Sequence, residues 1–201
     1  MSIQSMKLQV LNMAKRCHAE GLLTGVSGNV SMYDPDIFTM AITPTSMLYD
    51  QMEVDDIVCI ALDGQLVDGK HKPSSEWRMH ATIYQRYSSV KAQIHTHSPY
   101  ATSFAVGGTP IPLILVEMLP LLGGDVKVAK FASAGTAEVG HNALNVLVNR
   151  NACLLESHGA LAVGGNLEQA YIHATCLEEV AKTYAIALSN GFEIKEIGND
   201  E

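Results

Sequence analysis

The sequence predicts one α/β domain over residues 1–201, because patterns typical of strands and of helices alternate along the whole chain. The length fits one ordinary domain. A composition with 47% hydrophobic and 17% charged residues is that of a globular protein. No linker, repeat or shift in composition divides the chain. We therefore expect one folded unit that needs no disulfide bonds to hold it together.

The first half of the chain predicts one helix and three short strands. Apolar residues from Ile3 to Cys17 recur at spacings of three and four, which is typical of a helix, and Gly21 ends the pattern. β-Rich runs that end at proline or glycine turns predict the strands. In chain order we expect a helix at 3–20, a short strand before the turn at 34–36, and strands at 38–43 and 57–62.

The second half mixes both kinds of element. Ser74 and Ser75 stand where the N-cap of a helix is expected, and that helix should run to about Tyr87. The expected elements after it are a strand at 90–97, a helix from about 98, a strand at 111–115, a short helix at 116–122, a helix at 137–149, strands at 152–156 and 160–163, and a helix at 167–190.

Charge and cysteine usage exclude several classes of partner and location. Thirteen basic against 21 acidic residues argue against nucleic acid or an anionic membrane as the main partner. The amphipathic start does not resemble a signal peptide, and no apolar stretch approaches the ~18 residues of a membrane span. The cysteines are scattered without a C-x-x-C motif, which is typical of reduced thiols. We expect a cytoplasmic protein.

Three histidines form the sharpest chemical signal. His95 and His97 are two residues apart in a predicted strand, so both imidazoles can face one ion. His158 lies between two apolar runs, beside Gly159, and is a candidate third ligand. Three histidines with an open fourth position are typical of catalytic zinc, since structural sites have four protein ligands. The alternative is a polar strand end and a hydrogen-bonded turn residue.

Glu76 is the candidate general acid or base. It is expected in the first turn of a helix, where the helix dipole favours a carboxylate even without a catalytic role. Glu76 ends the segment Pro-Ser-Ser-Glu, which is one of three loops rich in small polar residues. The other two are residues 26–29 and 43–46. Such loops offer hydroxyl and N–H donors to an anion, although none is a P-loop and ordinary turn chemistry explains each as well.

Nine short motifs occur in order along the chain: GVSGNVS (25–31), ITPT (42–45), DIV (56–58), LDG (62–64), KPSSEW (72–77), HTHS (95–98), GGD (123–125), GTAE (135–138) and SHG (157–159). Together they resemble the class II aldolase/adducin family over about residues 5–190. The resemblance is closest to the bacterial L-fuculose-phosphate aldolases. It implies a single α/β/α domain with a central, mainly antiparallel sheet flanked by helices, assembled as a C4-symmetric homotetramer with active sites between subunits.

The resemblance also implies the roles of individual residues. His95, His97 and His158 match the zinc ligands, one ion per chain (zinc or another divalent metal), and Glu76 matches the catalytic carboxylate beside the ion. The positions that surround a substrate phosphate are Gly28, Asn29, Thr45, Ser46, Ser74 and Ser75. The implied activity is cleavage of a ketose 1-phosphate, like L-fuculose 1-phosphate or a 5-deoxypentulose 1-phosphate, to dihydroxyacetone phosphate and an aldehyde.

One departure from the family pattern concerns the aldehyde side of the site. Fuculose-phosphate aldolases carry a tyrosine, contributed by a neighbouring subunit as proton donor, shortly after the stretch that matches 111–112. Residues 113–118 contain no tyrosine here, and Glu117 is the nearest ionisable group. Because Glu117 lies in an apolar run, we expect it to be buried and either functional or paired across the interface with Lys127 or Lys130.

Three other functions stay open, two of them enzymatic. A sugar-phosphate 4-epimerase uses the same metal and phosphate site, but such relatives tend to have aspartate where this chain has Glu76. A methylthioribulose-phosphate dehydratase would use Glu76 on an α-proton. A non-catalytic adducin-like interaction module is the third, although adducin heads lack the metal histidines that this chain keeps.

Overall fold

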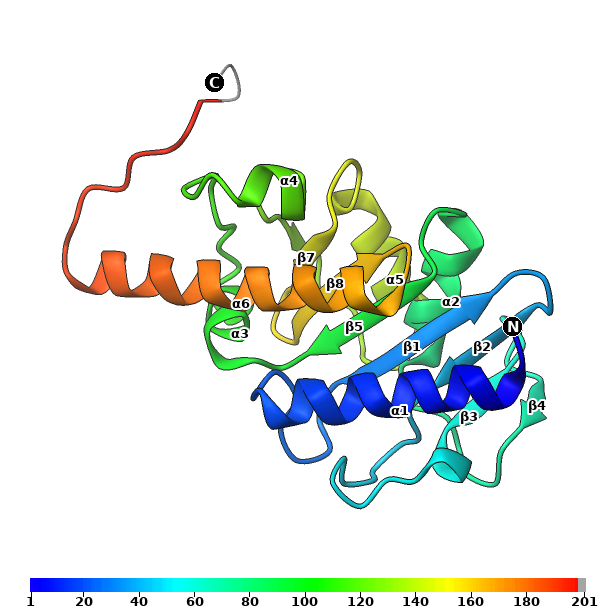
Figure 1. Ribbon diagram of the computed structural model, residues 1–201. Helices are drawn as coiled ribbons and strands as arrows, with labels where there is room; N and C mark the ends of the chain where they lie inside the picture. The colour runs from blue at the N-terminus through cyan, green and yellow to red at the C-terminus, as the bar shows by residue number, and fades with distance from the viewer. Residues whose placement is uncertain (199–201) are drawn as a thin grey trace.

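An eight-stranded sheet lies at the centre of the computed structural model, which describes residues 1–198 (Figure 1). The strand order is β4-β3-β2-β1-β5-β8-β7-β6, and every neighbouring pair is antiparallel except β6–β7. The strands are β1 (Asn29–Asp34), β2 (Thr39–Ile42), β3 (Val58–Ile60), β4 (Leu66–Asp68), β5 (Ala92–Thr96), β6 (Val128–Ala129), β7 (Ala152–Leu155) and β8 (Gly159–Gly164). The expected mainly antiparallel sheet is confirmed. The last three residues of the predicted domain, 199–201, lie outside the described part of the chain.

Helices cover both faces of this sheet. Figure 1 shows α1 (Ile3–Ala19) and α6 (Leu167–Ser189) crossing the same face. On the opposite face, α2 (Trp77–Arg86) and α5 (Ala137–Val146) pack together. A buried apolar cluster lies on each side, so the predicted α/β/α arrangement is confirmed. The shorter helices are α3 (Pro99–Val106), α4 (Met118–Leu122) and the 3-10 helix η1 (Val54–Asp56).

Helix α1 illustrates how the sequence pattern produces an element. The Ser2 hydroxyl accepts a hydrogen bond from the Ser5 N–H at 3.2 Å and so caps the helix. Met6, Val10 and Ala14, spaced by four residues, are fully buried against the sheet. Within residues 1–198, no helix combines the length and the apolar character that crossing a membrane requires.

Strands β1 and β5 separate apolar from polar side chains by their alternation. Val30 and Ile94 belong to the apolar cluster on the α1 and α6 face. Their neighbours Asn29 and His95, which are paired across the two strands, therefore point to the face covered by α2. The pairing of β1 with β5 thus carries one polar residue of each strand to the N-terminal end of α2.

The predicted strand at 111–115 is wrong. Pro110 and Pro112 have no N–H to donate to a ladder, and only Ile111 forms an isolated bridge, to Val126. The helix expected at 137–149 ends at Val146. The sequence analysis did not predict β4, β6 or η1, which are two or three residues long and too short to show a period.

Candidate functional site

Four side chains from three separate segments converge at one end of β5. They are Glu76 before α2, His95 and His97 at the end of β5, and His158 in the turn between β7 and β8. Their potential ligand atoms all lie within 4.8 Å of one another. The structure therefore brings together all three histidines and the carboxylate that the sequence analysis singled out.

His95 is the fully buried centre of this cluster. Its Nδ1 lies 2.8 Å from the Ala160 carbonyl oxygen on β8. A carbonyl only accepts hydrogen bonds, so Nδ1 donates to it and Nε2 is the ring nitrogen that faces the cluster. An ion bound there would use the lone pair of Nε2, and a backbone carbonyl on the other ring nitrogen is the kind of partner that orients metal-binding histidines.

The other two histidines approach His95 from different directions. Strand β5 ends at Thr96, so His97 lies just beyond the strand, yet its Nε2 is 3.0 Å from His95 Nε2. The three imidazole rings are 4.7–5.2 Å apart between centroids and meet edge to face. Partial burial of the imidazole, together with repulsion from His95 and His158, lowers the pKa of His97 to about 4.

Gly159 permits this close approach. A Cβ atom at this position would lie 2.3 Å from the Thr96 carbonyl oxygen and 3.0 Å from His97 Cδ2. A side chain would therefore push the His158 turn away from the end of β5. Because it has no side chain, Gly159 lets the backbone of this turn come close to the end of β5.

Glu76 is buried and faces the histidines. Its Oε2 is 2.9 Å from His95 Nε2, and its Oε1 is 3.1 Å from His158 Nε2. Burial alone would raise the pKa of this carboxyl, but attraction to His95 and contacts with His158 and His95 outweigh it and hold the pKa well below its usual range. The carboxylate form is the one present at neutral pH.

The position of Glu76 relative to α2 differs from the expectation. Glu76 is the N-cap residue, not a first-turn residue, and its side chain makes no capping hydrogen bond. The Ser74 hydroxyl instead accepts a hydrogen bond from the Glu76 N–H at 3.3 Å. The carboxylate is therefore turned into the cluster and away from the helix end, contrary to a helix-capping role.

The donor set fits a divalent metal ion. Two nitrogens that each lie about 2.05 Å from a tetrahedral ion are about 3.3 Å apart, close to the separation of His95 Nε2 and His97 Nε2. Glu76 Oε1 is buried and accepts no hydrogen bond of normal geometry from residues 1–198, as expected for an oxygen that faces a cation. Three imidazoles and a carboxylate suit zinc and several other divalent ions.

The three small-residue loops lie side by side next to this cluster. The Thr45 N–H donates to the Lys72 carbonyl at 3.1 Å, and the Ser74 N–H donates to the Thr43 carbonyl at 3.0 Å. Asn29 Nδ2 donates to Glu76 Oε2 at 3.1 Å, which joins the first loop to the third. The predicted phosphate residues of all three loops thus gather around the N-terminal end of α2.

Individual members of these loops differ in what they offer. Thr45, Ser46 and Ser75 are exposed, and Gly28 is half-buried, so a ligand can reach them. Ser74 and Asn29 are buried, and the Asn29 amide is already engaged by Glu76. Asn29 therefore connects the loop region with the carboxylate, and its role as a phosphate contact stays a prediction.

Glu117 is exposed in the protomer, so the expected burial is wrong for a single chain. It directly precedes α4. In this helix Met118 and Leu122 are buried and Leu119 is exposed, and Val116, just before Glu117, is exposed too. Glu117 is not part of the four-residue cluster, and it forms no ion pair with any described residue of its own chain. Its place in the aldehyde side of a site stays a prediction.

Supporting groups near the site were missed because no local signal marks them. The Ala160 carbonyl that orients His95 is one, since a backbone atom leaves no trace in residue identity. Another is the contact of Asp56 Oδ1 with His71 Nε2 at 2.9 Å, which anchors the chain just before Lys72. Both partners are ordinary polar residues, and only the fold brings them together.

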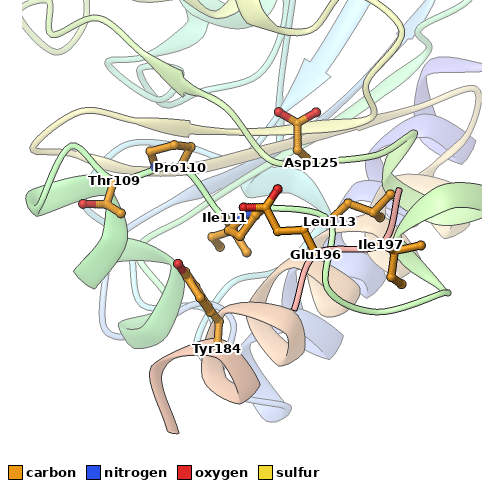
Figure 2. Close-up of a pocket in the computed structure, with 9 residues that line it drawn as sticks. Thr109, Pro110, Ile111, Leu113, Asp125, Tyr184, Glu196 and Ile197 are labelled. Carbon is orange, nitrogen blue, oxygen red and sulfur yellow. The ribbon is translucent and has the colours of Figure 1, made fainter. Parts of the chain in front are cut away.

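A separate pocket of about 510 Å³ lies away from these residues (Figure 2). Figure 2 shows it between the Thr109–Leu113 segment, Tyr184 of α6 and the following residues Glu196 and Ile197. The Ile197 N–H donates to the Leu113 carbonyl at 2.8 Å, and this hydrogen bond joins two segments of the pocket wall. None of the described lining residues belongs to the predicted site.

Comparisons with known proteins agree with this geometry. Residues 8–185 match the Class II Aldolase and Adducin N-terminal domain family. A 5-deoxy-D-ribulose 1-phosphate aldolase of Bacillus thuringiensis is 31% identical, covering 100% of this chain and 93% of the relative. A 5-methylthioribulose-1-phosphate/5-deoxyribulose-1-phosphate aldolase of Rhodospirillum rubrum is 36% identical, covering 87% and 78%. A solved L-fuculose 1-phosphate aldolase has a TM-score of 0.94 at 34% identity, covering 100% and 93%.

Removal of one imidazole should release the metal ion. We expect near-stoichiometric divalent metal in the purified protein and loss of most of it in His97→Ala, because one nitrogen ligand disappears. His141→Ala removes an exposed histidine on α5 and should leave the metal content unchanged. Elemental analysis of the dialysed proteins measures both. Full metal retention in a double His95→Ala, His158→Ala variant would contradict the site.

The same cluster sets a pH dependence of stability and of metal retention. An unfolded histidine titrates near ~6.5, whereas the pKa of His97 in the fold is about 4. Between these values the unfolded chain binds more protons, so the stability of the metal-free protein should fall as the pH is lowered. Protons also compete with metal for the same nitrogens. Denaturant unfolding and metal content, measured from pH 7 to 4, should both decline, and His97→Ala should weaken the pH dependence of unfolding.

Proposed function

Because the chain belongs to the class II aldolase and adducin N-terminal domain family, we propose that it is a metal-dependent aldolase that cleaves a ketose 1-phosphate to dihydroxyacetone phosphate and an aldehyde. The observation that carries the proposal is the convergence of Glu76 with three histidines beside the small-residue loops. Relatives named for 5-deoxyribulose 1-phosphate and L-fuculose 1-phosphate support a substrate of that class.

Zinc is the ion that we propose for the cluster. Three imidazole ligands with an open position are the donor set of many catalytic zinc sites. When bound, such an ion acts as a Lewis acid on the carbonyl and adjacent hydroxyl oxygens of a substrate. His95, His97 and His158 would hold it, and the Ala160 carbonyl would keep His95 in the required tautomer.

Glu76 would move the proton at the carbon next to the substrate carbonyl. In the condensation direction, its carboxylate takes this proton from dihydroxyacetone phosphate, and in cleavage the same group returns it to C3. The charges around Glu76 favour the carboxylate, the form that can accept a proton. The hydrogen bond from Asn29 Nδ2 fixes Oε2, which orients the other oxygen for the transfer.

The loops would bind the phosphate through uncharged donors. Ser75, Thr45 and Ser46 are exposed beside the cluster, and Gly28 lies in the adjoining loop. Binding energy from a phosphate held there orients the reacting carbons at the cluster, although the phosphate itself does not react. Hydrogen bonds to a charged group are the stronger class, so a few aimed donors suffice.

The assembly and location are also proposals. We propose a C4-symmetric homotetramer of a single domain, with sites between subunits, in the cytoplasm. Exposed apolar side chains at Val116, Leu119 and Phe131 support a contact between copies. All four cysteines are buried and free, which supports a reducing compartment.

Released dihydroxyacetone phosphate is the measurement that tests the activity. Among phosphorylated ketoses, we expect 1-phosphates to be cleaved, and Glu76→Gln should cut turnover roughly 10²–10⁴-fold if the carboxyl acts in proton transfer. Glu138→Gln is a matched control, since Glu138 is an exposed first-turn acid of α5. Unchanged kcat in Glu76→Gln would contradict the role, and conversion to an epimer without release would indicate a 4-epimerase.

Ser75→Ala should act on phosphate binding alone. Loss of one donor to a charged group costs roughly 1.5–3 kcal/mol, so KM for a phosphorylated ketose should rise about 10- to 150-fold. Turnover of an unphosphorylated analogue should change little, and Ser133→Ala, at another exposed loop serine, should affect neither. Steady-state kinetics on the two substrates provide the comparison. Equal effects on both would indicate that Ser75 only shapes the turn before α2.

We propose that Glu117 serves the aldehyde half of a neighbouring subunit's site. Its exposure beside Val116 and Leu119 in the protomer leaves the carboxyl free to reach another copy. Glu117→Gln should reduce cleavage steeply, while proton exchange on bound dihydroxyacetone phosphate continues because Glu76 is intact. If the tetramer dissociates and both activities are lost together, Glu117 is a structural residue of the interface.

A further inference from the structure

Tyr49 is a buried tyrosine, 2% exposed, in the segment that follows the Thr45–Ser46 loop. Its hydroxyl donates to the Gly28 carbonyl at 2.7 Å, with the Ser27 carbonyl 3.2 Å away. We infer that Tyr49 is a positioning residue of the proposed phosphate site. Its hydroxyl holds the first loop, together with the preceding residues from Thr24 on (the 24–28 loop), in the conformation that receives an anion. The inference rests on the proposed function and adds a residue that does not touch the substrate.

The 24–28 loop needs such an external contact. Thr24, Gly25 and Val26 are exposed, and the internal turn depends on the Ser27 N–H donating to the Thr24 carbonyl at 3.0 Å. Gly25 and Gly28 both have positive φ angles, of 61° and 80°. Glycines restrict the chain least, so the loop has the conformational freedom that a fixed contact must remove.

Gly28 is held from two sides. A Cβ atom at this position would lie 2.5 Å from Leu23 Cδ2 and 2.6 Å from the His95 carbonyl oxygen, so the backbone already lies against the end of β5. Tyr49 Oη binds its carbonyl. The loop is therefore clamped between the metal-ligand strand and the tyrosine hydroxyl.

The direction of these carbonyls sets the direction of the neighbouring amides. In a trans peptide the N–H of the next residue points opposite to the carbonyl oxygen. With the Ser27 carbonyl turned toward Tyr49, the Gly28 N–H points away from it. A backbone N–H at this loop is one of the donors proposed for phosphate. By binding the Ser27 carbonyl, the hydroxyl of Tyr49 therefore keeps the Gly28 N–H directed away from Tyr49 and available to an anion.

Tyr49 also ties two of the loops together. It belongs to the same segment as Thr45 and Ser46, and the Thr45 N–H is in turn bound to Lys72 of the third loop. On the far side, the ring of His18 in α1 lies 5.7 Å from the Tyr49 ring, and His18 Nδ1 donates to the Leu23 carbonyl at 2.9 Å. One side chain thus connects α1, the first loop and the second loop.

The hydroxyl remains a proton donor throughout the working range of pH. Burial raises the pKa of Tyr49 well above its usual range, with smaller contributions from Cys17 and Glu76. Its two carbonyl partners can only accept. Phenylalanine at this position would keep the packing and remove the donor, which makes it a clean test.

The experiment compares Tyr49→Phe with Tyr84→Phe. Tyr84 is also buried, but its hydroxyl lies 2.7 Å from Ser31 Oγ in β1 and not against the Ser27 and Gly28 carbonyls. We expect Tyr49→Phe to raise KM for the phosphorylated ketose, and the inhibition constant of inorganic phosphate, about tenfold. Its kcat on an unphosphorylated analogue and its metal content should match those of Tyr84→Phe. Tyr49→p-aminophenylalanine restores a donor and should restore KM.

Three results would decide against the inference. Identical KM values in Tyr49→Phe and Tyr84→Phe, equal losses on both substrates, or no recovery with p-aminophenylalanine would each assign Tyr49 to the core alone. The assays run well below the unfolding temperature of the least stable variant, with circular dichroism and metal analysis on each. If the wild type itself releases no dihydroxyacetone phosphate and binds no inorganic phosphate, the proposed function fails, and this outcome is measured on the wild type independently of the variants.

Discussion

The antiparallel pairing of β5 with β1 on one side and β8 on the other is the constraint on which the site depends. Opposite His95, β1 presents Asn29 and β8 presents Leu161, one residue from the Ala160 carbonyl. A shift of one residue in either register would turn these groups to the other face of the sheet. The ladder hydrogen bonds thus place His95, the carbonyl that orients its ring and the amide that contacts Glu76.

The buried carboxylate of Glu76 is tolerated because its partners are in place before any ligand arrives. An unpaired charge at this depth would cost several kcal/mol after relaxation. Here His95, His158 and Asn29 surround both oxygens. The same contacts lower the pKa of Glu76, so one arrangement offsets the cost of burial and keeps the carboxylate ionised.

The cluster of Glu76 with three histidines is tied to the small-residue loops by hydrogen bonds. Asn29 connects the first loop to Glu76, and backbone hydrogen bonds connect the second loop to the third. Gly28 and Gly159 have no room for a side chain, because each lies against the end of β5. A phosphate bound at the loops would therefore be held at a set distance from the histidines, as orientation of the reacting carbons requires.

Periodicity and motif spacing determined most of the secondary structure, the α/β class and the identity of the four clustered residues. The long elements were predictable because repeating apolar side chains at 3.6- or 2-residue periods must face a core, as in α1 and β8. The His-x-His pair was predictable because two residues in extended chain share a direction, although His97 lies beyond the strand end. The detailed sheet arrangement was expected through family resemblance and not through the pattern itself.

Other features were decided only by tertiary structure. Prolines on both sides of Ile111 prevented the strand that its apolar neighbours suggested. Glu117 is exposed because only one of its two apolar neighbours, Met118, enters the core, while Val116 faces outward. Glu76 lies at the N-cap of α2 and not in the first turn where it was expected, and its three partners come from β1, β5 and the β7–β8 turn. Tyr49 and the Ala160 carbonyl act through contacts between segments distant in the chain. Residue identity specifies which groups a side chain can bind, but only the packing of distant segments decides which of those groups lies within reach.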